Sequence, residues 1–226
     1  MSFSNTFLFG IYPYIAFFIC VIACCIRFEK EPYSWRADSS QMLRKKNMRW
    51  ASNWFHIGII FVLCGHIAGL LTPESVYHYV ISTEAKQMVA MVTGGAFGLL
   101  CFVGLTGLIV RRFTDERIKA NSRFSDFLVL ILLYVQLILG LSTIVVSTGH
   151  LDGSVMVMLA NWAQNIVTFN MTEAVANIAP VHWIYKAHVF LGVTLFIVFP
   201  FTRLVHIVSA PVWYFGRKYQ LVRQKV

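Results

Sequence analysis

Residues 51–71 read ASNWFHIGIIFVLCGHIAGLL, an apolar stretch without a charged side chain that contains two histidines, His56 and His66. A helix of about 20 residues crosses the roughly 30 Å hydrocarbon layer of a membrane. A neutral imidazole is costly in hydrocarbon unless another group satisfies its ring nitrogens. The stretch therefore predicts a membrane-spanning helix whose two histidines have partners inside the membrane.

Four more apolar stretches are long enough to span, and the last of them carries a second histidine pair, His188 and His206. The chain is 58% hydrophobic and 13% charged, with a mean hydropathy of +0.66, which is too apolar for a water-soluble core. We therefore expect an all-α integral membrane protein that forms one domain over residues 1–226. The five predicted transmembrane helices cover residues 7–26, 51–71, 87–110, 127–146 and 182–207.

The first stretch is expected to remain as a span, because Arg27 closes it and no small-residue cleavage pattern follows. Nearly all of the 19 lysines and arginines fall in three segments: 27–49, 111–123 and 203–225. Because successive spans cross the membrane in opposite directions, these three segments lie on the same side. The positive-inside rule then puts the N-terminus outside and the C-terminus in the cytoplasm. The net charge of +9 indicates topology and attraction to anionic lipids, or docking of a cytoplasmic protein, and gives no support for nucleic-acid binding.

The long outer connection, residues 147–181, contains no lysine or arginine. Apolar residues recur there at helical spacing: Val155, Leu159, Trp162, Ile166 and Phe169. This predicts a short amphipathic helix at the outer interface, which either anchors to the membrane surface or covers a lipid-soluble substrate.

The cysteines all lie in apolar segments and lack a CxxC pair: Cys20, Cys24, Cys25, Cys64 and Cys101. We interpret them as small buried apolar residues rather than a disulfide framework or a thiolate metal site.

The antiparallel course of the second and fifth spans pairs the histidines by depth. His66 should lie near His188 on the outer side, and His56 near His206 on the cytoplasmic side. Ten residues along one helix cover about 15 Å and eighteen along the other about 27 Å, so the helices must tilt; eighteen residues also make five turns, which puts His188 and His206 on one face.

No carboxylate or thiolate stands near either pair, which favours haem over zinc or a di-iron centre. Two axial imidazoles leave the iron no open position, so the expected chemistry is electron transfer. The alternative is that these histidines only bond to carbonyls or hydroxyls within the bundle. Four glycines close to the histidines would let a flat macrocycle approach the backbone: Gly58, Gly65, Gly69 and Gly192. The remaining histidines, His78, His150 and His182, fall on or beside outer loops.

Several segments carry a resemblance along nearly the whole chain: IYPYIA, SSQML, ASNWFHIGI, CGHIAGLLTP, EAKQMVAM, WAQNIVTF, FPFTRLVHI and RKYQLVR. The sequence resembles the gamma subunit of membrane-bound respiratory nitrate reductases, their cytochrome b component. The resemblance implies two b-type haems, held by His66 with His188 on the outer side and by His56 with His206 on the inner side. It also implies oxidation of a quinol, menaquinol or ubiquinol, near the outer haem.

The same resemblance implies electron transfer to an iron–sulfur beta subunit and then to a molybdenum-containing alpha subunit that reduces nitrate to nitrite. The location would be the bacterial cytoplasmic (inner) membrane. Within EAKQ, Lys86 would bind the quinol together with Gly65 and Gly69, although a lysine there could simply reach the interface. Arg112 and Arg203 would bind the inner haem propionates, or else only anchor helix ends.

The C-terminal segment, with Trp213, Tyr214 and RKYQLVR, suits docking to soluble subunits or contact with lipid. Two other classes remain open at this point. The membrane cytochrome of a formate, hydrogen or sulfur-compound oxidoreductase would carry the same histidine pairs. A proton or ion transporter is less favoured, because the ten acidic residues avoid the span centres.

Overall fold

The computed structural model describes residues 2–36, 39–40, 43–45, 48–209 and 216. Over these ranges the chain is helical and contains no strand. The five helices that are long and apolar enough to cross a membrane cover Phe3–Lys30, Met48–Leu71, Thr83–Thr114, Phe124–Ser147 and Trp183–Phe201. The structure thus confirms the five predicted spanning helices, and it supports a multi-pass membrane protein by helix length and composition.

The first spanning helix is built from three consecutive segments without a break in the coil. They are α1 (Phe3–Thr6), the π-helix η1 (Phe7–Ile11) and α2 (Tyr12–Lys30). The next spans are α3 (Met48–Leu71), α5 (Thr83–Thr114) and α7 (Phe124–Ser147). Each begins earlier than hydropathy alone predicted, because polar first turns are part of the helix; α5, for example, starts after Ser82, whose hydroxyl accepts from the amide of Ala85.

The fifth span differs from the prediction, because the helix does not continue to residue 207. The α-helix α10 (Trp183–Val198) gives way to two 3₁₀ turns, η3 (Phe199–Phe201) and η4 (Arg203–Val205), and then to α11 (His206–Ser209). Pro200 lacks an amide hydrogen and Thr202 is extended, at φ −123° and ψ −178°. The expectation that His188 and His206 share one face of a continuous helix is therefore wrong.

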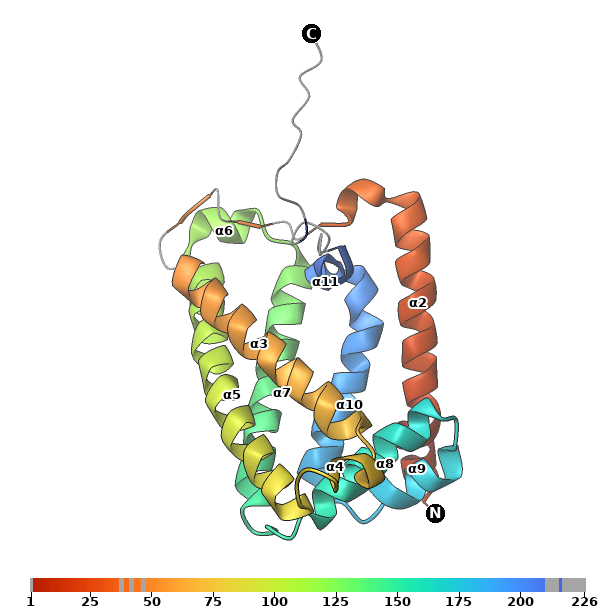
Figure 1. Cartoon of the computed structure of the whole chain (residues 1–226). Coiled ribbons are helices and arrows are strands. Elements are labelled where there is room, and N and C mark those ends of the chain that lie inside the picture. Colours follow the sequence, from red (N-terminus) through yellow and green to blue (C-terminus); the bar gives the residue numbers. More distant parts are fainter. Residues whose placement is uncertain (1, 37–38, 41–42, 46–47, 210–215, 217–226) are drawn as a thin grey trace.

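Short helices close the two ends of the bundle (Figure 1). The helices α4 (Glu74–Tyr77), α8 (Ser154–Val167) and α9 (Met171–Ile178) lie at the end that holds the N-terminus, here called the α8 end. The helices α6 (Glu116–Ala120) and α11 lie at the opposite end, called the α6 end.

The predicted amphipathic helix in the outer connection is confirmed as α8. Its apolar stripe packs inward on Phe9, Ile178 and Tyr185, so it faces protein instead of anchoring in lipid. Phe169 is the exception to the stripe. It follows α8 at φ 62° and stacks on the ring of Tyr14 with 5.6 Å between centroids.

Helix α3 packs along α5 and crosses the bundle obliquely (Figure 1). Two glycines allow the backbones to meet: a Cβ at Gly104 would lie 2.4 Å from the amide nitrogen of Phe55, and one at Gly58 would lie 2.6 Å from that of Cys101. Gly58 therefore serves helix packing and does not face a cofactor space, which corrects that part of the prediction. Helix α10 packs on α2 and α7, and α3 and α10 are not among the closely packed pairs of the described chain.

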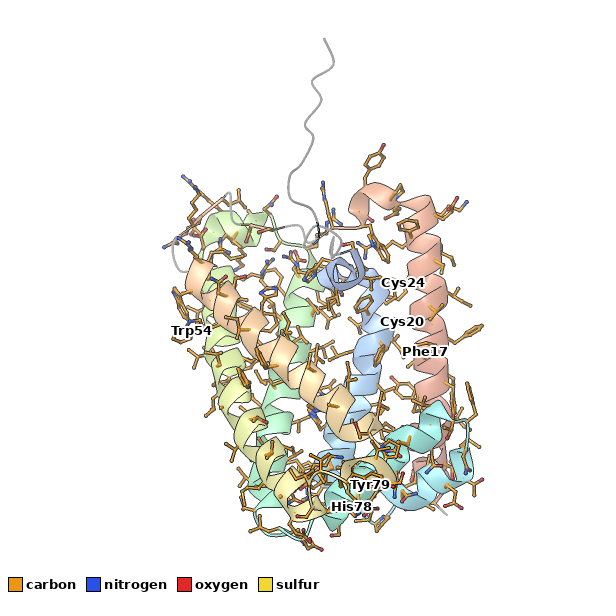
Figure 2. The ribbon with its side chains drawn as sticks, viewed as in Figure 1. Phe17, Cys20, Cys24, Trp54, His78 and Tyr79 are labelled. Atoms are coloured by element: carbon orange, nitrogen blue, oxygen red, sulfur yellow. The ribbon has the colours of Figure 1, made fainter. Side chains whose placement is uncertain are left out.

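All five cysteines are free, as expected. Only Cys101 is buried; Cys20 and Cys24 are partly covered on α2 (Figure 2), and Cys25 and Cys64 are exposed. The prediction of buried small residues is thus wrong for most of them, because in a membrane bundle apolar side chains can face the lipid.

Candidate functional site

The four span histidines meet in two pairs. The rings of His66 and His188 have centroids 6.0 Å apart and planes inclined by 41°. Those of His56 and His206 have centroids 6.2 Å apart and planes inclined by 70°. The first pair lies toward the α8 end and the second toward the α6 end, so the rings from α3 meet those from α10 and α11 at two depths.

Each of the four rings uses one nitrogen in the same way. The Nδ1 atoms of His56, His66, His188 and His206 lie 2.7, 2.8, 3.1 and 2.6 Å from the carbonyl oxygens of Ser52, Val62, Gln136 and Arg203. A carbonyl can only accept, so the geometry assigns the hydrogen to Nδ1 and leaves Nε2 with a free lone pair. Within the described ranges, no hydrogen bond reaches Nε2 of these rings. The alternative of histidines satisfied within the bundle thus accounts for one nitrogen of each ring and not for the other.

The ring separations fit a metal between the two members of each pair. A metal–nitrogen bond of about 2.0–2.1 Å and about 1.1 Å from nitrogen to ring centre would put the centroids of two imidazoles on opposite sides of one metal about 6.2–6.4 Å apart. The separation of 6.2 Å lies at the lower limit of this range and that of 6.0 Å is just below it. Among the described residues, no group of three or more histidine, cysteine or acidic side chains could hold a metal ion. Each pair supplies two imidazoles, so a metal held there would have to bring further ligands of its own.

The neighbouring helix α7 holds the ring of His188, which no sequence pattern indicated. Gln136 accepts from Nδ1 of His188 through its carbonyl and donates from Nε2 to the His188 carbonyl at 3.0 Å. A Cβ at Gly140 would lie 2.9 Å from Cε1 of the same ring. The absence of a side chain at residue 140 leaves space for the imidazole of His188.

The glycines predicted near the histidines divide into two groups. A Cβ at Gly65 or Gly69 would meet no atom within 4 Å, so one face of α3 beside His66 is open. A Cβ at Gly192 would lie 3.1 Å from the side-chain nitrogen of Gln136, so this glycine packs against α7. Of the predicted group, Gly65 and Gly69 have room for a ligand.

Lys86 lies at the α8 end, folded onto the protein. Its Nζ donates to the carbonyl of Gly69 at 3.1 Å and lies 3.7 Å from the ring centroid of Tyr77. The structure thus brings together Lys86 and Gly69, with Gly65 one turn away along α3. Lys86 thus contacts a carbonyl of the last turn of α3 and the face of an aromatic ring. Tyr77, buried beneath it, was missed at the sequence level.

Arg112 and Arg203 meet at the α6 end, where they share one carboxylate. Nη1 of Arg112 lies 3.2 Å from Oδ2 of Asp126, and Nη2 of Arg203 lies 2.7 Å from Oδ1. Asp126 is buried in the first turn of α7 and also accepts from the amide of Arg123. The carbonyl of Arg203 accepts from His206, which places one of these arginines directly beside the second histidine pair. Asp126 was not identified from the sequence.

A second carboxylate at this end lies beyond the spans. Asp115 accepts from Arg44 at 2.5 Å and from the amides of Arg117 and Ile118, which caps α6. The hydrogen bond from Arg44 and the bonds from the backbone amides hold the pKa of Asp115 below its usual range.

The other three histidines stay apart from the pairs. His78 bonds to Thr83 at 2.9 Å and lies at the α8 end (Figure 2). His182 caps α10 by accepting from the amide of Ile184, and His150 presents its carbonyl to Gln87. These positions agree with the loop locations expected for them. The predicted docking segment with Trp213, Tyr214 and RKYQLVR lies outside the described residues.

Residues 5–225 match the family model described as the nitrate reductase gamma subunit. The chain is 48% identical over 225 residues to the respiratory nitrate reductase 1 gamma chain of Escherichia coli (strain K12), with all of both chains covered. It is 44% identical over 227 residues to the respiratory nitrate reductase 2 gamma chain of that organism, covering 100% of this chain and 99% of the relative. The gamma chain from Bacillus subtilis (strain 168) is 33% identical over 223 residues, covering 98% and 99%.

Proposed function

Because the chain belongs to the nitrate reductase gamma subunit family, we propose that it is the membrane cytochrome b subunit through which a respiratory nitrate reductase oxidises quinol. A gamma chain implies other subunits in the same oxidoreductase complex. We assign those partners as an iron–sulfur beta subunit and a molybdenum-containing alpha subunit, which would carry the site that reduces nitrate to nitrite.

The single observation that carries the proposal is the pair of ring separations, 6.0 and 6.2 Å, with Nε2 left free on all four rings. His66 with His188, and His56 with His206, would each hold one haem b. When bound, haem would supply one-electron redox chemistry. The backbone carbonyls that accept from Nδ1 keep each imidazole in one tautomer and one orientation. This is the usual role of hydrogen bonds to the ring nitrogen that does not bind the metal.

The side chains around the two pairs suit different tasks. Gly65 and Gly69 leave room beside the outer pair for a flat ring. At the inner pair, Arg112 and Arg203 would bind propionates, and Asp126 holds both guanidinium groups in place for that contact.

Quinol would bind at the α8 end, near Lys86 and the open face of α3. The ammonium group of Lys86 would donate a hydrogen bond to a quinol oxygen while the carbonyl of Gly69 orients it. With the N-terminus outside, oxidation there releases two protons outside while the electrons pass inward. Moving one charge across the membrane stores about 2.3 kcal/mol per 100 mV.

Family membership favours this reading over the cytochrome of a formate, hydrogen or sulfur-compound complex. A transporter is also less favoured. The acidic side chains of the spans lie in first or last turns, and Asp126, in the first turn of α7, is paired with two arginines.

The test is a dithionite-reduced minus oxidised spectrum of the purified chain, with haem and protein quantified together, in the wild type and in single His→Ala variants. We expect two low-spin b haems; the variants at His66 and His188 lose one of them, and those at His56 and His206 lose the other. His150→Ala, on an exposed loop at the α8 end, serves as the control and keeps both. Absence of haem from a well-folded chain would overturn the proposal and favour the transporter class.

A further inference from the structure

The break in the fifth span leaves backbone groups that the helix no longer satisfies. Pro200 prevents α10 from continuing as a regular α-helix. Thr202, two residues later, is extended and buried, with 3% of its surface exposed. Carbonyls at such a break lose the amides that a continuing helix would supply. Buried carbonyls need other donors, so the partners of these two residues determine the shape of the break.

The donor is Arg27, from the last turn of α2. Its Nη1 donates to the carbonyl of Pro200 at 2.5 Å and to that of Thr202 at 2.9 Å. Its Nε and Nη2 donate to the hydroxyl and carbonyl of Ser34 at 3.1 and 2.9 Å. The Ser34 hydroxyl in turn lies 2.9 Å from the carbonyl of Glu31. The guanidinium is thus fixed from both sides, in an arrangement that requires its planar set of donors.

Short contacts connect this break to the ring of His206. The hydroxyl of Thr202 accepts from the amide of Leu204 and begins η4, where Val205 is fully buried. The carbonyl of Arg203 accepts from Nδ1 of His206 at 2.6 Å. No flexible linker lies between the carbonyls that Arg27 holds and the imidazole.

We propose that Arg27 is a positioning residue for the inner histidine pair. By holding the carbonyls of Pro200 and Thr202, it sets the direction in which α11 presents His206 to His56. In the sequence, Arg27 is one of the basic residues that indicate the cytoplasmic side of the membrane. A topology signal needs only a positive charge, whereas holding several carbonyls at once needs the planar set of donors of a guanidinium group. The spectroscopic test of this role rests on the proposed function, because it measures the haem that His56 and His206 would bind.

The experiment compares Arg27→Gln, Arg27→Lys and the matched control Lys30→Gln. Lys30 lies in the same last turn of α2, is exposed, and carries the same charge. In the oxidised protein, electron paramagnetic resonance should resolve two low-spin signals, assigned by their loss in His206→Ala and His188→Ala. We expect Arg27→Gln to shift or abolish the signal lost in His206→Ala and to leave the other in place. Arg27→Lys should resemble Arg27→Gln, because it keeps the charge and loses the fork, and Lys30→Gln should match the wild type.

Two results would overturn the inference: both signals unchanged in Arg27→Gln, or both disturbed equally. Amide hydrogen exchange of residues 199–206 is measured in parallel on the same samples. If the wild type carries no haem, the proposed function fails and exchange still decides the role of Arg27. Faster amide exchange in Arg27→Gln than in Lys30→Gln supports the positioning role of Arg27, and equal exchange in the two variants refutes it. Arg27→Lys gives the same comparison should Arg27→Gln fail to fold.

Discussion

The two histidine pairs have nearly the same ring separation but are built differently. In the pair at the α8 end, which the proposal places on the outer side, His188 sits within the regular helix α10, and the adjacent helix α7 orients it through Gln136 and Gly140. In the pair at the α6 end, the inner pair of the proposal, His206 follows a break, and its Nδ1 bonds to the carbonyl of Arg203 three residues earlier. The Nδ1 atom of His188 is therefore bonded to a neighbouring helix, and that of His206 to a carbonyl of its own segment.

This difference resolves the mismatch in spacing between the two helices. The ten residues from His56 to His66 rise about 15 Å along α3, and the ten from His188 to Val198 rise about the same along α10. The α-helix then stops, and the chain turns through Pro200 before it reaches His206. A continuous helix would have carried His206 roughly 12 Å farther along its axis. Helix α3 does run obliquely across the bundle, in agreement with the expected tilt (Figure 1).

The surroundings of the pairs also differ in charge. The α8 end is covered by the apolar stripe of α8, and Lys86 is the cation that contacts Gly69 of α3 there. The α6 end holds Arg112 and Arg203 around the carboxylate of Asp126. Such a contrast suits an apolar substrate at one end and charged groups at the other.

The largest effect is expected at the inner end. In Asp126→Asn, the amide can still accept from the amide of Arg123, but the buried Arg112 loses its compensating charge. Removing one partner of a buried ion pair costs about 3–5 kcal/mol. We expect a markedly lower melting temperature in detergent and a weakened inner haem signal. Glu116→Gln, which removes an exposed charge at the same end, is the control.

The two haem signals of Asp126→Asn also test whether the two ends of the bundle are independent. If the outer signal fell as much as the inner one, the two ends would not be independent structural units.

A complementary change acts on the outer pair. Gly140→Ala would place a Cβ 2.9 Å from the ring of His188, and overpacking of this kind costs about 1–3 kcal/mol. We expect a shifted spectrum or a lower occupancy of the outer haem, with the inner haem intact. In the control Gly94→Ala, the new Cβ meets its nearest neighbour at 4.0 Å, so nothing should change. Equal spectra for the two variants would mean that α7 does not orient His188.

The spans and the partners within each pair could be predicted from the sequence, because both depend on hydrophobic length and on counting along antiparallel helices. The break before His206 could not be derived that way. Pro200 lies in an apolar run that satisfies any hydropathy window, and proline is tolerated in membrane helices when other groups take up the freed carbonyls. Here Arg27, 173 positions before Pro200, donates to the freed carbonyls.

Contacts that depend on tertiary geometry were out of reach for the same reason. The backbone carbonyl of Gln136 is a partner of His188, and every residue has a carbonyl. Gly58 was assigned to the cofactor space because it is close to His56 in sequence, yet it faces α5. Asp126 resembles an ordinary helix-capping residue until the structure brings Arg112 and Arg203 to it.

A chemical difference between the ends follows from Lys86. In Lys86→Ala, the cation beside Gly69 is lost while both histidine pairs remain. Loss of a charged hydrogen bond of about 1.5–3 kcal/mol predicts a fall in quinol oxidation of roughly ten- to a hundredfold. The haem spectrum should stay as in the wild type. Lys186→Ala is the control, because this lysine bonds to the carbonyl of Ala179 at the same end. Unchanged quinol oxidation and quinone-analogue binding in Lys86→Ala would remove the assigned site.

The smallest effect is expected from Asp115, at the α6 end. Its pKa is held below the usual range by Arg44 and by the backbone amides that it caps. A carboxyl whose pKa is lower in the folded state stabilises the fold above its unfolded pKa of about 3.9, and this stabilisation is lost as the pH falls through the folded value. The melting temperature of Asp115→Asn should therefore lie slightly below that of the wild type at pH 7, and the gap should close toward pH 3. Added salt should narrow the gap at pH 7, since Arg44 is partly exposed. A gap that stayed constant or widened with acid would show that Asp115 acts through the cap geometry alone, and the α6 end would then depend on charge only at Asp126.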